Sequence, residues 1–170
     1  SIALAREKGR FPLFDRDNYL RGEFIRQLPP ALREDMHRHG MRNSHVTAIA
    51  PTGTISLLAN NVSSGLEPVF RFVYQRRMRD AEGGLRLHPV EDYAHALFRQ
   101  QYGAAELPPA FVSVADIPPP AHLAMQAALQ PYVDSAISKT INVPRDYSYA
   151  GFRGLYDDAF DRGLKGCTTF

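Results

Sequence analysis

Residues 46–56 have the sequence Val46-Thr47-Ala48-Ile49-Ala50-Pro51-Thr52-Gly53-Thr54-Ile55-Ser56. In this stretch an apolar, β-rich run is followed by small and hydroxyl-bearing residues. The run 46–50 predicts a short strand, and Pro51 stops it because proline has no N–H to offer a strand ladder. The residues after Pro51 predict the start of a helix, since hydroxyl side chains are frequent at helix N-termini. A strand followed closely by a helix is the building unit of an α/β fold.

The rest of the chain alternates helices and strands in a similar way. The last helix is the clearest, because six apolar side chains recur in it at three- and four-residue spacing: Phe152, Leu155, Tyr156, Ala159, Phe160 and Leu164. The other expected elements are a helix closed by Gly9, helices near 17–26, 31–40, 90–102 and 120–134 (broken near Pro131), strands at 70–79, 111–115, 136–144 and from 168, and a hairpin turn at 80–84. This order predicts an α/β fold with a mostly parallel sheet, formed by residues 1–170 without an internal boundary.

Composition excludes several classes of protein. The 170 residues are 44% hydrophobic and 22% charged, which is typical of a chain with a packed core. The net charge is 20 − 18 = +2, too balanced for a nucleic-acid binder with a basic stripe, so no direct DNA binding is expected. No apolar run approaches the roughly 20 residues that cross a bilayer, so no membrane association is expected. With one cysteine and no leader sequence, the expected location is the cytoplasm.

The turn after the first strand is the strongest candidate site. Backbone N–H groups at a helix N-terminus, joined by nearby hydroxyl groups, form an anion-binding arrangement, and a glycine lets a phosphate approach the backbone closely. The alternative is a helix cap without a ligand. The candidate phosphate-binding residues are Pro51, Thr52, Gly53, Thr54, Ile55 and Ser56.

The histidines and the single cysteine predict no metal site and no nucleophile. His37 and His39 are two residues apart, so they do not share a helix face, and His45 does not complete a ligand set. They are interpreted as solvated side chains. Cys167 has no adjacent histidine or helix N-terminus to activate its thiol, so a buried structural role is expected.

Two charged features keep alternatives open. The arginines of the predicted strand 70–79 are interpreted as a solvated face, and the alternative is contact with phosphate or a partner; they are Arg71, Arg76, Arg77 and Arg79. Glu67, before a proline and after a loop, is a candidate for capping, bracing or binding.

The two ends indicate a piece of a longer chain. The first residues have the composition of the last turns of a helix, and no methionine precedes them. The final residues after Gly166 resemble the beginning of a strand. A fragment is therefore expected.

Four segments in order resemble the large chain of ribonucleotide reductase. They are Met41-Arg42-Asn43-Ser44-His45-Val46-Thr47-Ala48-Ile49-Ala50-Pro51-Thr52-Gly53-Thr54-Ile55-Ser56, Asn60-Asn61-Val62-Ser63-Ser64-Gly65-Leu66-Glu67-Pro68-Val69-Phe70, Ser138-Lys139-Thr140-Ile141-Asn142-Val143-Pro144 and Gly163-Leu164-Lys165-Gly166-Cys167-Thr168. The resemblance covers about residues 40–170. Within the family, the second and third segments are most similar to the adenosylcobalamin-dependent (class II) enzymes.

The resemblance implies a fold, a reaction and a site. The chain would be the C-terminal part of a ten-stranded α/β barrel whose complete enzyme converts ribonucleotides to deoxyribonucleotides for DNA synthesis. The radical would start from cleavage of the cobalt–carbon bond of adenosylcobalamin. The stretch Pro51–Ser56 would bind the phosphates of a ribonucleoside di- or triphosphate, and no residue here is matched to cobalamin contacts.

The single cysteine limits what this chain does alone. The family needs a radical cysteine and a pair of thiols, so no catalytic residue is expected in this segment, and the isolated fragment is expected to be inactive. The implied partners are the remainder of the same catalytic chain and a thioredoxin-like or glutaredoxin-like reductant; the oligomeric state stays open, with a homodimer among the options. The alternatives are the large chain of a metal-cofactor (class I) reductase and a non-catalytic nucleotide-binding protein that retains the half-barrel.

Overall fold

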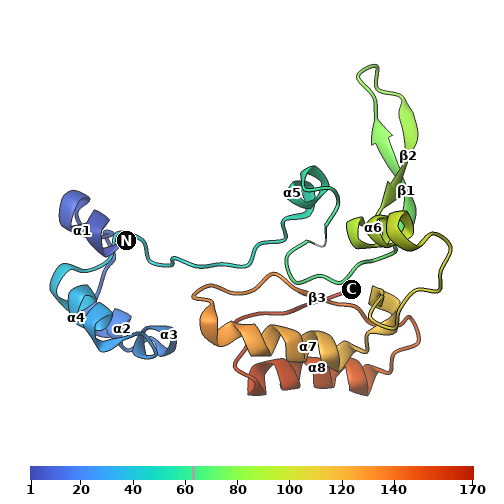
Figure 1. The fold of residues 1–170 in the computed structure, drawn as a ribbon. Helices are drawn as coiled ribbons and strands as arrows, with labels where there is room; N and C mark the ends of the chain where they lie inside the picture. The colour runs from blue at the N-terminus through green and yellow to red at the C-terminus, as the bar shows by residue number, and fades with distance from the viewer. Residues whose placement is uncertain (63) are drawn as a thin grey trace.

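The computed structural model describes residues 1–62 and 64–170. Four helices near the N-terminus form one group, and an extended segment connects them to the rest of the chain (Figure 1). The helices are α1 (Ile2–Lys8), α2 (Arg16–Leu20), α3 (Glu23–Arg26), α4 (Pro30–His39), α5 (Gly53–Leu58), α6 (Tyr93–Tyr102), α7 (Pro119–Leu129) and α8 (Tyr149–Asp161), with 3-10 turns η1 (Val114–Asp116) and η2 (Gln130–Tyr132). The strands are β1 (Val73–Arg79), β2 (Leu85–Glu91), β3 (Thr140–Ile141) and β4 (Thr168–Thr169).

The N-terminal helices α1 to α4 enclose a small core of their own. Ile25, Met36 and Met41 are buried in it, and the rings of Phe11 and Phe14 meet edge to face at 5.3 Å. Helices ending at Gly9 and Gly40 are confirmed, at α1 and α4. The single helix expected near 17–26 is instead two short helices, because Arg21 and Gly22 separate α2 from α3.

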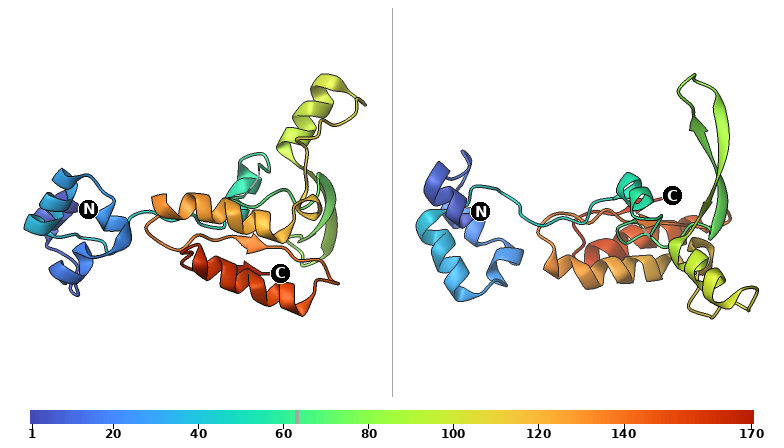
Figure 2. Two further views of the ribbon diagram at one scale, coloured as in Figure 1. Left: turned by 90° about the horizontal axis from the view of Figure 1, so that it is seen from below. Right: turned by 45° about the horizontal axis from the view of Figure 1, so that its top comes forward.

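The second core lies between the long helices α7 and α8 and the parallel pair β3–β4. Figure 2 shows the two helices side by side, with β3 next to them. Leu123, Ile141, Leu155 and Ala159 are buried there. The apolar stripe expected in the last helix is confirmed in part, because Leu155 and Ala159 face this core, whereas Tyr156 and Phe160 are exposed. Half-buried Cys167 packs against the same core, which agrees with its expected structural role.

The strands expected at 46–50 and 136–144 are much shorter in the structure than the sequence predicts. Segments 46–50 and 136–144 do run in parallel, but Ile49 and Ile137 form only an isolated bridge, and only Thr140–Ile141 is regular strand. Backbone hydrogen bonds from Ser135 to Thr47 and from Ser138 to Ile49, each 3.0 Å, hold the segments together. Pro51 has no N–H with which to continue this ladder.

Strands β1 and β2 form the expected antiparallel hairpin, with Arg76 opposite His88. The carboxylate of Asp80 accepts a hydrogen bond from the Gly84 N–H across the turn (2.6 Å). The hairpin projects from the body of the protein (Figure 1), so apolar residues such as Val73 and Leu87 are exposed as well as polar ones. The expected mostly parallel sheet is therefore wrong for the described strands: one pair is antiparallel, one is parallel, and they do not close a barrel.

One further expectation is corrected by local hydrogen bonding. The strand expected at 111–115 is absent, because Ser113 and Asp116 form a reciprocal capping box that turns the chain into η1. These hydrogen bonds from Ser113 lower the pKa of the Asp116 carboxyl. The break expected near Pro131 in the helix over 120–134 is confirmed: α7 ends at Leu129 and the chain tightens into η2 at Pro131, where proline has no N–H to donate. In the described chain, no helix has the length and apolar character to cross a membrane.

Candidate functional site

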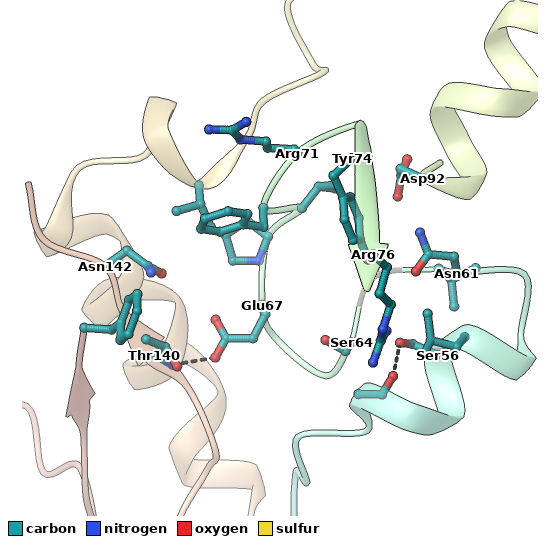
Figure 3. Close-up of a pocket in the computed structure, with 18 of the residues that line it drawn as sticks. Ser56, Asn61, Ser64, Glu67, Arg71, Tyr74, Arg76, Asp92, Thr140 and Asn142 are labelled. Carbon is teal, nitrogen blue, oxygen red and sulfur yellow. Dashed lines mark hydrogen bonds between the residues drawn. The ribbon is translucent and has the colours of Figure 1, made fainter. Parts of the chain in front are cut away.

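A cavity of about 620 Å³ lies between α5, the loop that follows it, the base of the hairpin and the strands β3 and β4. Figure 3 shows its walls, with Ser56 on α5, Arg76 on β1 and Thr140 and Asn142 on the opposite side. Of the predicted phosphate-binding residues, Gly53, Thr54 and Ser56 line the cavity. Pro51, Thr52 and Ile55 lie next to them in the turn and on the exposed side of α5 but do not line it.

The turn before α5 holds an unusual backbone conformation. Thr52 has φ 49° and ψ 19°, the left-handed region that β-branched residues rarely occupy. The first helical bond runs from the Ser56 N–H to the Thr52 carbonyl (2.8 Å), and the Ser56 hydroxyl donates to the Gly53 carbonyl (2.7 Å). The Thr52 side chain does not cap the helix. The N–H groups of residues 53–55 therefore precede the first helical bond, at an end without a side-chain cap.

Gly65, in the loop after α5, lies close to the backbone of this turn. It has φ 57°, and a Cβ placed on it would lie 2.8 Å from the Ala50 carbonyl oxygen. That distance is too short for any side chain at this position, so only glycine lets the following loop approach the backbone of the turn so closely.

The four arginines of residues 70–79 fall into two groups, those that line the cavity and those that do not. Tyr74 and Arg76 lie two residues apart on one face of β1 and both line the cavity, as does Arg71, whereas Arg77 and Arg79 do not. In Figure 3 the Arg76 side chain extends from β1 towards α5. Within residues 1–62 and 64–170, no hydrogen bond or ion pair occupies its guanidinium group. Of the two interpretations left open by the sequence, a solvated face therefore describes Arg77 and Arg79, and Arg76 is available to an anion in the cavity.

Glu67 is a brace between the loop and β3. One carboxylate oxygen accepts hydrogen bonds from the Lys139 ammonium (2.8 Å), and the other accepts from the Thr140 N–H (2.5 Å). The Lys139 side chain is 1% exposed and also donates to the Thr140 carbonyl (2.6 Å) and to His122 Nδ1 (2.9 Å). Burial, followed by the Lys139 charge and opposed by Glu67, lowers the pKa of His122. The imidazole is therefore neutral beside the ammonium group.

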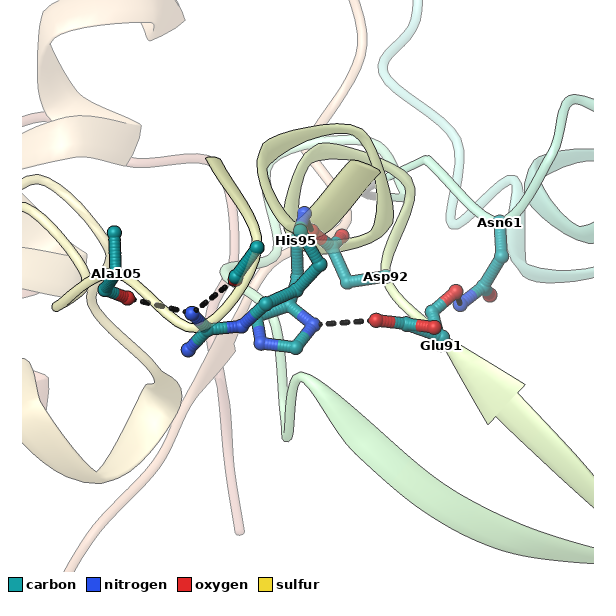
Figure 4. Close-up of polar contacts among 7 residues, drawn as sticks. Asn61, Glu91, Asp92, His95 and Ala105 are labelled. Atoms are coloured by element: carbon teal, nitrogen blue, oxygen red, sulfur yellow. Dashed lines mark hydrogen bonds and ion pairs between the residues drawn. The ribbon is translucent and has the colours of Figure 1, made fainter. Parts of the chain in front are cut away.

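A second set of contacts fixes the rim where the hairpin meets α6 (Figure 4). The Asp92 carboxylate caps α6 by accepting from the His95 N–H (3.0 Å), and Glu91 contacts His95 Nδ1 (2.6 Å). The Asn61 side chain donates to the Glu91 carbonyl (2.9 Å), which joins the loop after α5 to the end of β2. Asp92, directly before the helix, is a local N-cap signal that could have indicated this end of α6, whereas the contact of Asn61 spans 30 residues and has no local signal.

The remaining candidates lie away from the cavity. His37 and His45 are exposed, and His39 is half-buried. In the part of the chain that the structure describes, no cluster of three or more histidine, cysteine or acidic residues is arranged to hold a metal ion. Burial raises the pKa of the Cys167 thiol, which keeps it protonated and unreactive.

Comparison with known protein families identifies the family of this chain. The family model of the ribonucleotide reductase barrel domain matches residues 1–170. The chain belongs to the ribonucleotide reductase barrel family. The family expected from residues 40–170 is thus confirmed, and the match extends to the N-terminal helices α1 to α4 as well.

Curated relatives of this ribonucleotide reductase segment carry names that specify a cofactor. A vitamin B12-dependent ribonucleoside-diphosphate reductase of Mycobacterium tuberculosis (strain CDC 1551) is 33% identical over 100% of this chain and 25% of its own length. One of the same name from Thermoplasma acidophilum is 33% identical over 100% of the chain and 22% of its own. A vitamin B12-dependent ribonucleotide reductase of Rhodopirellula baltica is 27% identical over 87% of the chain and 17% of its own. The chain therefore spans a quarter or less of the length of these relatives.

Proposed function

We propose that this chain forms the substrate-phosphate end of the catalytic barrel of a vitamin B12-dependent ribonucleotide reductase. The observation that carries the proposal is that the turn at Gly53, Thr54 and Ser56, in a chain of this family, lines a cavity together with Arg76. In the complete enzyme the chain would contribute the C-terminal part of a ten-stranded α/β barrel. Its product, a deoxyribonucleotide, would serve DNA synthesis in the cytoplasm.

The residues of this chain would bind and orient the substrate. The N–H groups of residues 53–55 and the Thr54 hydroxyl would donate to oxygens of a ribonucleoside di- or triphosphate, with Arg76 facing them from β1. Holding the phosphates at one end of the cavity fixes where the ribose lies. Such positioning contributes on the order of several kcal/mol to catalysis without any chemical step by these residues.

The radical chemistry would come from outside this segment. Adenosylcobalamin, when bound to the complete enzyme, supplies the radical that begins reduction of the ribose. No motif of this chain is matched to a cobalamin contact, so we assign none to its residues. Because this chain has one cysteine, we propose that the radical and redox cysteines belong to the remainder of the catalytic chain. Electrons would come from a thioredoxin-like or glutaredoxin-like reductant.

Cofactor dependence tests the assignment directly. Ribonucleotide reduction by the complete chain is measured with and without adenosylcobalamin. Activity only with the cofactor supports the proposal. Activity without it, in the presence of a separate radical-generating subunit, would assign the chain to the metal-cofactor class. A folded complete chain that binds nucleotide and is inactive in both conditions would indicate a non-catalytic nucleotide-binding protein.

Truncating the hydroxyl groups of the turn is expected to weaken substrate binding. In the complete enzyme, Thr54→Ala and Ser56→Ala should each raise KM by about three- to tenfold, with a smaller fall in kcat, because each removes one hydrogen bond of the phosphate site or of its first turn. Steady-state kinetics with the nucleoside diphosphate measures both constants. Ser44→Ala, at an exposed position outside the cavity, is the control. Unchanged KM in both variants would count against the site.

Arg76 and Arg77 provide a matched pair for testing the charge of the cavity. Arg76→Gln should raise KM by about tenfold, because a charge-assisted hydrogen bond to phosphate is lost. Arg77→Gln removes the same charge from the neighbouring residue, which does not line the cavity, and should change KM less than twofold. An equal rise in KM in the two variants would show that the net charge of the hairpin, and not the position of Arg76, determines substrate affinity.

A further inference from the structure

The cavity that we assign to an anion has two carboxylates in its described wall, Glu67 and Asp92. Asp92 is used as the N-cap of α6, where it accepts from the His95 N–H at the edge of the cavity. Glu67 lies between α5 and β3 (Figure 3), and its side chain is 25% exposed. An uncompensated carboxylate at this place would repel the phosphates of a substrate.

Lys139 is the cation that compensates this charge. Its ammonium group lies 2.8 Å from Glu67 Oε2, and its side chain is 1% exposed, so solvent screens the pair little. Lys139 does not line the cavity. Its three donors meet Glu67, the Thr140 carbonyl and His122 Nδ1. Because His122 accepts from Lys139, its imidazole is neutral, and the cluster of Glu67, Lys139 and His122 carries no net charge.

We propose that Lys139 is a positioning residue of the substrate site, which neutralises Glu67 from behind the cavity wall and so allows one carboxylate to brace β3 while the cavity accepts phosphate. The proposal rests on the proposed function. Glu67 is needed in the wall because it accepts the Thr140 N–H and thereby joins the loop to β3. Lys139 acts on the substrate only through Glu67.

A charge-balance series in the complete enzyme tests this role. Lys139→Met removes the cation beside Glu67 and should raise KM for the nucleoside diphosphate about tenfold. Glu67→Gln keeps an acceptor for the Thr140 N–H but removes the negative charge, so that the Lys139 charge is no longer balanced and KM should fall about two- to threefold. The double variant Glu67→Gln/Lys139→Met has no unpaired charge and should return KM to within about threefold of the parent. Competition by inorganic pyrophosphate should follow the same order.

Measurements of KM at different ionic strengths, and in a conservative variant of Lys139, distinguish an effect of its charge from an effect of its packing. The KM defect of Lys139→Met should shrink as ionic strength rises, because the repulsion by Glu67 acts through the partly solvated cavity. Lys139→Arg keeps the charge and should retain most of the affinity. Asp158→Asn, which breaks the exposed pair with Arg162 on α8, is the control and should leave KM unchanged.

The outcomes distinguish this inference from the proposed function. Equal KM defects in Glu67→Gln, Lys139→Met and the double variant would overturn the electrostatic role and indicate a structural one. If Lys139→Met does not fold, the single Glu67→Gln variant and the double variant decide, since a raised KM in both overturns the inference. Thr54→Ala is measured beside them. The charge asymmetry is the expected pattern in which KM rises in Lys139→Met but not in Glu67→Gln or the double variant. A raised KM in Thr54→Ala without this asymmetry rejects only the role of Lys139. The asymmetry without an effect of Thr54→Ala or Ser56→Ala rejects only the turn as the phosphate site.

Discussion

Gly65→Ala is expected to raise KM for the nucleotide substrate by about tenfold or more, the largest change among the substitutions considered. The new methyl group would lie 2.8 Å from the Ala50 carbonyl oxygen, which is backbone and cannot rotate away. The turn that carries Thr52, already in the left-handed region, would have to move. A shift of about 1 Å in a positioning element is enough to reduce catalysis on the order of a hundredfold.

The hairpin turn supplies a control for Gly65→Ala. Gly83 also has a positive φ, of 83°, but a Cβ placed there would contact nothing within 4 Å. Gly83→Ala therefore introduces the same kind of backbone strain without the collision, and kinetics should stay close to those of the parent enzyme. Similar KM values for Gly65→Ala and the parent would show that the loop does not hold the turn.

Leu123→Ala is expected to destabilise the α7–α8 core by about 3 kcal/mol. Leu123 is 0% exposed and lies in the cluster with Ile141 and Leu155, so its removal leaves a cavity between α7, β3 and α8. Hydrogen exchange of backbone amides in the complete enzyme measures the effect locally. Amides of α7 and α8 should exchange on the order of a hundredfold faster.

Phe160→Ala is the matched control for this core substitution. Phe160 lies on α8 but is 82% exposed, so removing the ring should change the exchange of α7 and α8 little. An equally large acceleration by Phe160→Ala would show that this face of α8 is packed against another part of the complete enzyme. Unchanged exchange in Leu123→Ala would contradict the described core.

Local signals predicted the elements that local interactions make. The turn from Asp80 to Gly84 needs only neighbouring residues and is confirmed. The spacing of the last helix is confirmed as α8, but only part of its apolar stripe is buried. The run 111–115 has the composition of a strand, but the hydrogen bonds of Ser113 with Asp116 override that preference. Strand pairing depends on distant partners, so the length of 46–50 as a strand could not be predicted from its own residues.

For the candidate site, too, the sequence indicated the residues with a local pattern but not the contacts between distant residues. Gly53, Thr54 and Ser56 carry a local pattern, and all three line the cavity. Choosing Arg76 over Arg77 requires the register of the hairpin, which the alternation of the strand alone does not fix. The brace between Glu67 and Lys139 joins residues 72 positions apart, and nothing in either neighbourhood indicates the other.

The parallel pairing has a consequence for the order in which the protein folds. Val46 meets Asp134 across 88 residues and Thr140 meets Glu67 across 73, so the cavity closes only when distant parts of the chain have come together. The hairpin and the individual helices form from neighbouring residues and do not wait for these encounters. Loop-closure entropy therefore places the cavity among the last regions to become ordered, after the elements that surround it have formed.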